Sequence, residues 1–246
     1  MTMNRENLIS KFRIAFGDNV PLPVAISYTD RPLGNPPAKK VHCIMQHLIT
    51  ARDGEPISLS AENVLCGGGK VYTGYGDLTD RICNFVSGVE KYKETPQLVA
   101  DYVDALRLPG REGQYLNFIK IDNPNVDLDS SEGIVIFGNA DVVSGLWSWA
   151  HFDNNHDDAL VAPFGSGCSS TISNMVRENR NNGYRCFIGM LDISVRPMMK
   201  SGEMVVSIPR CRLSQMMETI DRSCLSGAPA WKKVKDRIDN EYQTEN

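Results

Sequence analysis

Two glycine-rich segments, each containing a cysteine, constrain the fold of this chain most strongly. They are residues 66–69 (CGGG) and residues 165–168 (GSGC). Glycine at this density is typical of a turn whose backbone must approach another group closely. In each half of the chain, a strand-like run, a helical stripe and a second short strand-like run precede the turn. The sequence therefore predicts two structurally similar strand–helix–strand lobes of the α+β class, with mixed or antiparallel sheets.

The spacing of apolar residues predicts the individual elements. In the first half, helices are expected over residues 4–16, 41–52 and 79–107, and strands over residues 20–28, 62–66 and 115–122. In the second half, strands are expected over residues 133–138, 160–164, 186–196 and 203–209. Helices there are expected over residues 142–152, capped by Asp141, and over 172–180, 213–220 and 231–238.

The domain organisation follows from the absence of long linkers and low-complexity segments in the sequence. We expect a single domain over residues 1–246. Its parts are an N-terminal lobe of about residues 1–110, a C-terminal lobe of about residues 111–225, and a C-terminal helix and tail at 226–246.

Charge and hydropathy narrow the range of partners. The chain has 26 Lys and Arg against 30 Asp and Glu, a net charge of −4, and lacks the basic stripe that phosphate backbones require. No window reaches the roughly 18 apolar residues of a membrane helix, and the first residues carry charges where a signal peptide is apolar. We therefore expect a cytoplasmic protein with no nucleic-acid or membrane partner. The sequence leaves the oligomeric state open.

The seven cysteines are odd in number, and none of them forms a C-x-x-C pair. This spacing argues against a disulfide scaffold and against zinc ribbons or thioredoxin-type redox sites. Any metal ion would need ligands from distant segments.

Cys168 is the strongest candidate for a catalytic nucleophile. A thiol at a helix N-terminus faces unpaired N–H groups and the positive end of the helix dipole, which favour the thiolate. The alternative is a small buried residue that fills space under the turn.

The glycine turns are also candidates for ligand binding. Cys66, Gly67 and Gly68 could present backbone amides to an anion, as could Gly167, although residues 66–69 match neither a Walker A loop nor G-x-G-x-x-G. Arg196 is a candidate for holding a carboxylate or phosphate. The alternatives are a purely structural turn and a structural Arg196–Glu203 pair.

Two further sets of residues have the spacing of metal ligands. Cys43 and His47 lie four positions apart on an expected helix, so both could reach one metal ion. His151 and His156 occur in an acidic stretch with Asp153, where a solvated acidic loop is the simpler interpretation.

Several short segments, taken in order, resemble the family called domain of unknown function 169. The resemblance implies a soluble protein of a kind found in archaea and anaerobic bacteria, and it implies no particular activity. Cys43, Cys66 and Cys168 fall at matching positions. The matching segments are Leu22-Pro23-Val24-Ala25, Cys43 with Ala51-Arg52-Asp53-Gly54, Glu62 to Gly68, Gly165 to Cys168, and Arg196 through Glu203 to Ile208-Pro209.

The functional hypothesis is that Cys43, Cys66 and Cys168 meet in a shared cleft between the lobes. Such a cleft would bind a metal ion, an iron–sulfur cluster or a small-molecule ligand, with His47, water or substrate as a fourth metal ligand. One alternative is a metal-independent thiol enzyme with Cys168 as nucleophile. Another is a non-catalytic ligand-binding or assembly module.

Overall fold

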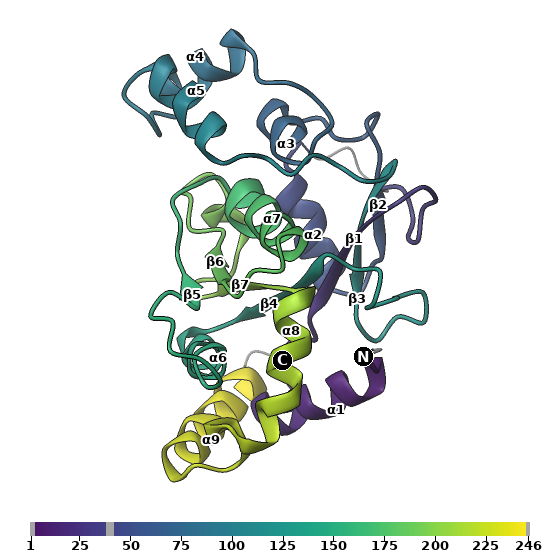
Figure 1. The fold of residues 1–246 in the computed structure, drawn as a ribbon, viewed down its shortest axis with the longest axis vertical. Helices are drawn as coiled ribbons and strands as arrows, with labels where there is room; N and C mark the ends of the chain where they lie inside the picture. The colour runs from purple at the N-terminus through teal and green to yellow at the C-terminus, as the bar shows by residue number, and fades with distance from the viewer. Residues whose placement is uncertain (1–2, 38–41, 245–246) are drawn as a thin grey trace.

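The computed structural model describes residues 3–37 and 42–244, and these residues form a mixed seven-stranded sheet (Figure 1). The strand order is β2-β3-β1-β4-β7-β6-β5. All neighbouring strands are antiparallel except β5 and β6, which are parallel. The strands are β1 Val24–Thr29, β2 Ile57–Leu59, β3 Tyr115–Lys120, β4 Gly133–Gly138, β5 Leu160–Val161, β6 Cys186–Gly189 and β7 Met204–Pro209.

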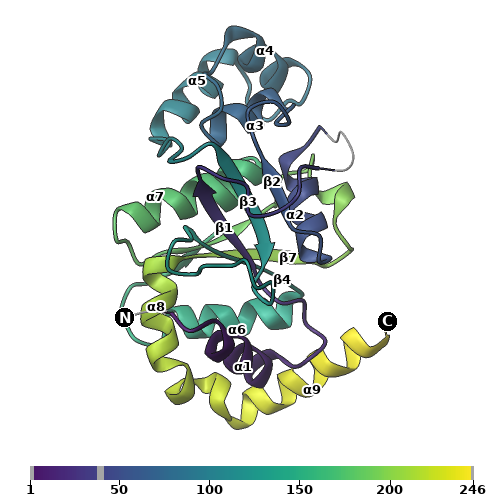
Figure 2. The same ribbon diagram turned by 90° about the vertical axis from the view of Figure 1, so that its right-hand side faces the viewer.

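The helices cover both faces of this sheet and extend beyond one end of it (Figures 1 and 2). A π-helical turn over Cys168–Ser173 leads directly into α7. The α-helices are α1 Arg5–Phe16, α2 Ile44–Arg52, α3 Gly67–Tyr72, α4 Asp80–Gly88, α5 Pro96–Ala105, α6 Ala140–Ala150, α7 Asn174–Arg180, α8 Arg210–Thr219 and α9 Pro229–Thr244.

Strand β4 shows how the alternation of side chains along a strand builds two cores. Ile134 and Ile136 face a core shared with α1, α6, α8 and α9. Val135 and Phe137 face the opposite core, which contains α2, the π-helical turn and α7. The sheet is therefore the middle of three layers.

Helices α3, α4 and α5 form a separate group, here called the cap, at the end of the molecule where α2 and α7 lie (Figures 1 and 2). Helices α4 and α5 begin at threonine N-caps, Thr79 and Thr95, whose hydroxyls accept a backbone N–H. Few cap side chains are buried: α3 buries Val71, α4 buries Cys83, and α5 buries Val99 and Val103. These residues belong to neither of the two sheet cores.

The predicted α+β class with a mixed sheet is confirmed, and most of the expected elements are present. Three predicted strands are wrong or too long, one of them being the strand predicted over 160–164, which covers only Leu160–Val161. The helix predicted over 79–107 is broken into α4 and α5. Residues 62–66 form a turn, in which the Asn63 side chain accepts the N–H of Ser60, and the strand lies earlier, at Ile57–Leu59. The strand predicted over 186–196 ends at Gly189 because Met190 adopts a left-handed φ of 55° and turns the chain away.

Two other local expectations also need correction. Asn139, and not Asp141, caps α6, since its side chain accepts the N–H of Val142. Gly67–Tyr72 is helical, so the first glycine segment begins a helix instead of remaining an open turn. Val41, part of the predicted α2 stripe, lies outside the described residues.

The two halves of the chain contribute to one continuous sheet. Each half supplies a central strand, β1 or β4, and these two strands pair antiparallel. If the two halves were a simple duplication, a twofold axis perpendicular to the sheet would relate the antiparallel strands β1 and β4. Rotation about such an axis does not exchange the two faces of the sheet, so α2 and α6, which follow these strands, would lie on the same face. Instead α2 packs on one face and α6 on the other. The halves thus depart from a simple duplication in this respect.

Candidate functional site

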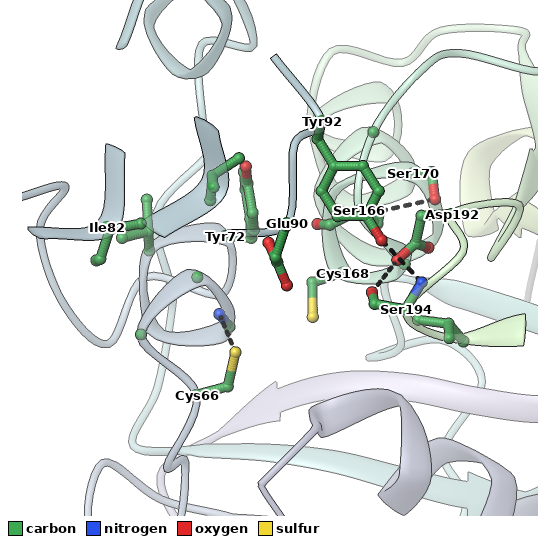
Figure 3. Close-up of a pocket in the computed structure, with 18 of the residues that line it drawn as sticks. Cys66, Tyr72, Ile82, Glu90, Tyr92, Ser166, Cys168, Ser170, Asp192 and Ser194 are labelled. Atoms are coloured by element: carbon green, nitrogen blue, oxygen red, sulfur yellow. Dashed lines mark hydrogen bonds between the residues drawn. The ribbon is translucent and has the colours of Figure 1, made fainter. Parts of the chain in front are cut away.

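A cavity of about 990 Å³ lies between the cap and the body of the protein (Figure 3). Its cap side is formed by α3, by Val99 and Tyr102 of α5, and by α4 with the segments that flank it. The body contributes residues 162–168 and 191–195 and the N-terminal end of α2. Cavities of this size are ordinary binding sites for small molecules.

The cavity is lined largely by apolar side chains, several of which are unusually exposed. Exposed fractions of large hydrophobic residues in the lining run from 41% for Leu65 to 71% for Ile193. Phe85, Phe164 and Leu191 are also exposed and also line the cavity. Exposed apolar groups gathered around a concavity mark a binding surface better than isolated ones do.

Cys43, Cys66 and Cys168 all line this cavity. They come from three distant parts of the chain: the residue before α2, the residue before α3, and the first residue of the π-helical turn. Figure 3 shows the sulfur atoms of Cys66 and Cys168 pointing into the same space from opposite sides. The structure thus brings together the three cysteines that the sequence singled out, and with them Gly67, Gly68 and Gly167.

Cys66 has a structural task as the N-cap of α3. Its Sγ accepts the N–H of Gly69 at 3.3 Å, which satisfies one of the unpaired donors at the helix start. The glycines allow α3 to pack closely, because a Cβ at Gly69 would lie 2.8 Å from Cδ1 of Ile44 in α2. The first glycine segment therefore seats α3 against α2 and aims Cys66 at the cavity.

Cys168 lies at a buried edge of the cavity. A Cβ at the preceding Gly167 would lie 2.7 Å from Cγ of Met45, so the turn also packs tightly against α2. Burial raises the pKa of Cys168 well above its ordinary value, and the neighbouring thiols of Cys43 and Cys66 raise it further. This direction is opposite to the one expected for a thiolate at Cys168, because the desolvation of the thiol has a larger effect than its place at the start of a helical turn. Burial also raises the pKa of Cys43.

A group of polar side chains lies at one end of the cavity. Asp192 Oδ2 accepts a hydrogen bond from Ser194 Oγ at 2.6 Å, and the Ser194 N–H donates to the hydroxyl of Tyr92 at 2.8 Å (Figure 3). Glu90 lines the same end. Burial raises the pKa of both carboxyl groups, and for Glu90 the charge of Asp192 raises it further.

Sequence reasoning missed Glu90, Tyr92 and Tyr72 as lining residues. Glu90 and Tyr92 lie in the break between α4 and α5, where no periodicity marks a side chain as inward-facing. Tyr72 is the last residue of α3, a helix too short to show an apolar stripe. Asp192 and Ser194 fall within the strand predicted over 186–196, and the structure places them in a loop that lines the cavity instead.

Two predicted site residues lie elsewhere. His47 is buried in α2, outside the set of described residues that line the cavity, and burial lowers its pKa. Arg196 also lies outside this set and donates to the carbonyl oxygen of Glu203 at 2.6 Å. The Glu203 carboxylate pairs with Arg52, also at 2.6 Å. Across residues 3–37 and 42–244, no three His, Cys, Asp or Glu side chains are grouped so that they could hold a metal ion.

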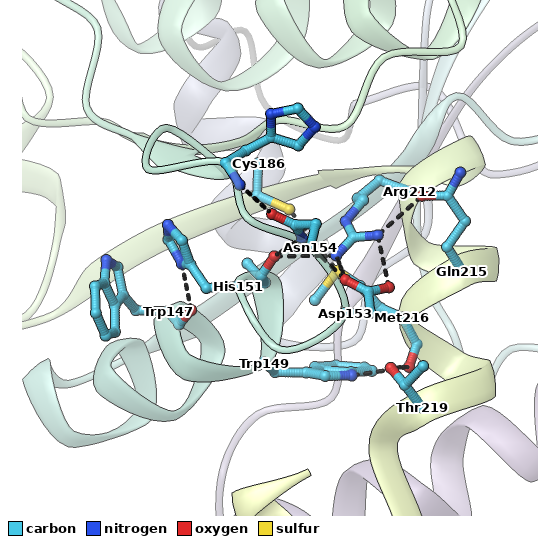
Figure 4. A network of polar contacts seen from close by, with 12 residues as sticks. Trp147, Trp149, His151, Asp153, Asn154, Cys186, Arg212, Gln215, Met216 and Thr219 are labelled. Carbon is cyan, nitrogen blue, oxygen red and sulfur yellow. Dashed lines mark hydrogen bonds and ion pairs between the residues drawn. The ribbon is translucent and has the colours of Figure 1, made fainter. Parts of the chain in front are cut away.

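The acidic stretch around His151 is held by polar contacts within the fold (Figure 4). Asp153 forms an ion pair with the buried Arg212, whose Nη2 also donates to the carbonyl oxygen of Ala150. The His151 ring packs against the Trp147 ring in a tilted arrangement, with ring centroids 4.7 Å apart. These contacts give the segment a structural role.

None of the helices in the described parts of the chain combines the length and apolar character that crossing a membrane requires.

Comparisons with known proteins bear on the family of the chain. No curated protein and no solved structure matches it. A family model for domain of unknown function 169, described as uncharacterised ArCR, matches residues 21–219. The match contains the three cavity cysteines and the whole cap, and it confirms the resemblance drawn from the short segments. The chain belongs to the domain of unknown function 169 family.

Proposed function

We propose that this protein binds a small organic molecule in the cavity between the cap and the sheet. The observation that carries the proposal is the cavity itself, which has a volume of about 990 Å³ and is lined by the exposed side chains of Leu65, Phe164 and Ile193. Exposing these side chains to water is unfavourable by roughly 25 cal/mol per Å² of apolar area. A ligand with an apolar body would remove that area from water.

The thiols fit this proposal as part of the lining. With raised pKa values, Cys43 and Cys168 are neutral at pH 7, and a neutral thiol behaves as a small polarizable hydrophobe. These two thiols thus favour an uncharged, polarizable surface on the part of the ligand that lies near them.

A variant whose larger side chain fills the cavity tests the proposal. Ile82 points into the cavity from α4 (Figure 3), so Ile82→Trp should occupy the volume that a ligand needs. The matched control is Val89→Trp, because Val89 is 67% exposed and is not among the lining residues. The probe is N-phenyl-1-naphthylamine, an uncharged apolar dye whose fluorescence rises when it leaves water.

We expect the wild type and Val89→Trp to bind the dye with the same affinity and Ile82→Trp to bind it at least about tenfold more weakly. Thermal unfolding of each variant shows whether it is folded. Equal binding by all three proteins, or no binding by the folded wild type, would contradict the proposal.

A further inference from the structure

We propose that the ligand is an organic cation: an amine with an apolar body, whose ammonium group lies at the end of the cavity formed by Glu90, Asp192, Tyr72 and Tyr92. This inference rests on the proposed function and specifies the class of ligand. The apolar body would extend toward Ile82 and Phe85 on the cap.

The carboxylate groups at this end have no partner lysine or arginine among the described residues. Neither Glu90 nor Asp192 forms an ion pair with a lysine or arginine in the part of the chain that the structure describes. Both are partly withdrawn from water and line the same end of the cavity, where the charge of Asp192 raises the pKa of Glu90. Two such carboxylates without a cation are unfavourable, and a bound ammonium would offset this cost.

Asp192 has an open position for a donor. Its Oδ2 accepts from Ser194 Oγ, whereas its Oδ1 is buried and has no hydrogen-bond partner among the described residues. A buried acceptor without a partner is rare, and its desolvation costs about 1–3 kcal/mol. A small movement of the 191–195 loop on binding would present Oδ1 to an N–H of the ligand.

Aromatic rings supply the second element of a cation site. The Tyr92 ring is anchored through its hydroxyl by the N–H of Ser194, at 2.8 Å, and Tyr72 lies across from it (Figure 3). Aromatic faces attract ammonium groups through the ring quadrupole. The cavity already shows this interaction: Nζ of Lys93 lies 4.2 Å from the ring centre of Phe164 and 5.2 Å from that of Tyr102.

The charged groups that face this end decide between a cation and an anion. Glu90 and Asp192 would each repel an anionic head group when ionised, whereas the neutral thiols of Cys43 and Cys168 carry no charge to attract or repel it. Among the described lining residues, the permanently cationic side chains are Arg81, which is exposed, and Lys93, which lies over aromatic rings; His42, also exposed, is a further titratable base of the lining. A carboxylate or phosphate ligand would therefore have to bind near Arg81, away from Asp192.

A set of matched probes tests the charge preference at pH 7: octylamine, 1-octanol and octanoate, each titrated by calorimetry into the whole protein. Each has a chain of eight carbons, the last of which is the carboxylate carbon in octanoate, and the three differ in the charge of the head group. We expect octylamine to bind about tenfold more tightly than octanol, and octanoate to bind most weakly.

Two variants locate the ammonium group. Glu90→Gln and Asp192→Asn should each weaken octylamine binding about three- to tenfold and leave octanol binding unchanged. Glu94→Gln is the control, because Glu94 is exposed on the same loop and does not line the cavity. Equal thermal unfolding of the three variants excludes a general loss of structure.

The outcomes separate this inference from the proposed function. Equal affinity for octylamine and octanol, or preference for octanoate, would overturn the amine while leaving an apolar binding site. Octylamine binding that neither carboxyl variant alters would also overturn it. Failure of all three probes, together with failure of N-phenyl-1-naphthylamine, would overturn both proposals.

Discussion

At the scale of single residues, the three cavity cysteines have different physical situations although they share one cavity. Cys66 completes the start of a helix, and Cys168 is buried with its thiol at a cavity edge. These differences are invisible in the sequence, where both are cysteines beside glycines. They lead to separate predictions.

Cys66→Ser should retain the N-cap of α3, whereas Cys66→Ala should lose it. A serine hydroxyl is a stronger acceptor than a thiol, so we expect the serine variant to be at least as stable as the wild type. The alanine variant should lose about 1 kcal/mol of the free energy of unfolding, measured by urea denaturation. If serine destabilised the protein as much as alanine does, the sulfur would have a role other than capping.

Cys168 should react slowly with iodoacetamide at neutral pH. Because burial raises its pKa in the folded state, the thiol form is favoured there, and the associated stability is present below the unfolded pKa of about 8.5. That stability is lost as the pH rises through the folded pKa. We expect the alkylation rate, followed by peptide mass spectrometry, to rise only above about pH 9. A midpoint near pH 7 would instead favour Cys168 as the nucleophile of a thiol enzyme.

At the scale of elements, two neighbouring glycines of α3 differ in whether a larger side chain would fit: there is room for one at Gly68 but not at Gly69. A Cβ at Gly68 would lie 3.7 Å from Cε2 of Tyr72, an ordinary contact, whereas at Gly69 it would lie 2.8 Å from Cδ1 of Ile44. The sequence CGGG cannot distinguish these positions, because the difference comes from α2, which packs against one side of the helix only.

Gly68→Ala should therefore stabilise the protein by about 0.4–1 kcal/mol, because alanine fits this position and restricts the unfolded chain more than glycine does. Gly69→Ala should destabilise it by about 1–3 kcal/mol, because α3 must move away from α2. Thermal unfolding of the two variants side by side measures this contrast. Equal effects of the two substitutions would mean that α3 is not seated on α2 as described.

At the scale of the whole molecule, the sequence predicted the regular elements better than their arrangement. Leu8, Phe12 and Phe16 recur at helical spacing, and all three are buried in α1. In contrast, the pairing of β1 with β3 and β4 joins segments about a hundred residues apart, and no local pattern encodes it. No local pattern encodes the cavity either, because Glu90 and Cys168 line the same cavity only as a result of where the cap lies on the body.

The cap should be the least stable part of the fold and the part that responds to ligand. Helix α4 buries only Cys83 among its described residues, whereas α6 buries six; few buried contacts allow local opening at low free energy. We expect amide hydrogens of α4 to exchange at least about tenfold faster than those of α6, by mass spectrometry. A molecule bound between cap and body contacts both, so saturating N-phenyl-1-naphthylamine should slow exchange in α4 and leave α6 unchanged. Equal protection of α4 and α6 without ligand would contradict the weak cap, and slowing confined to α6 would place the ligand elsewhere.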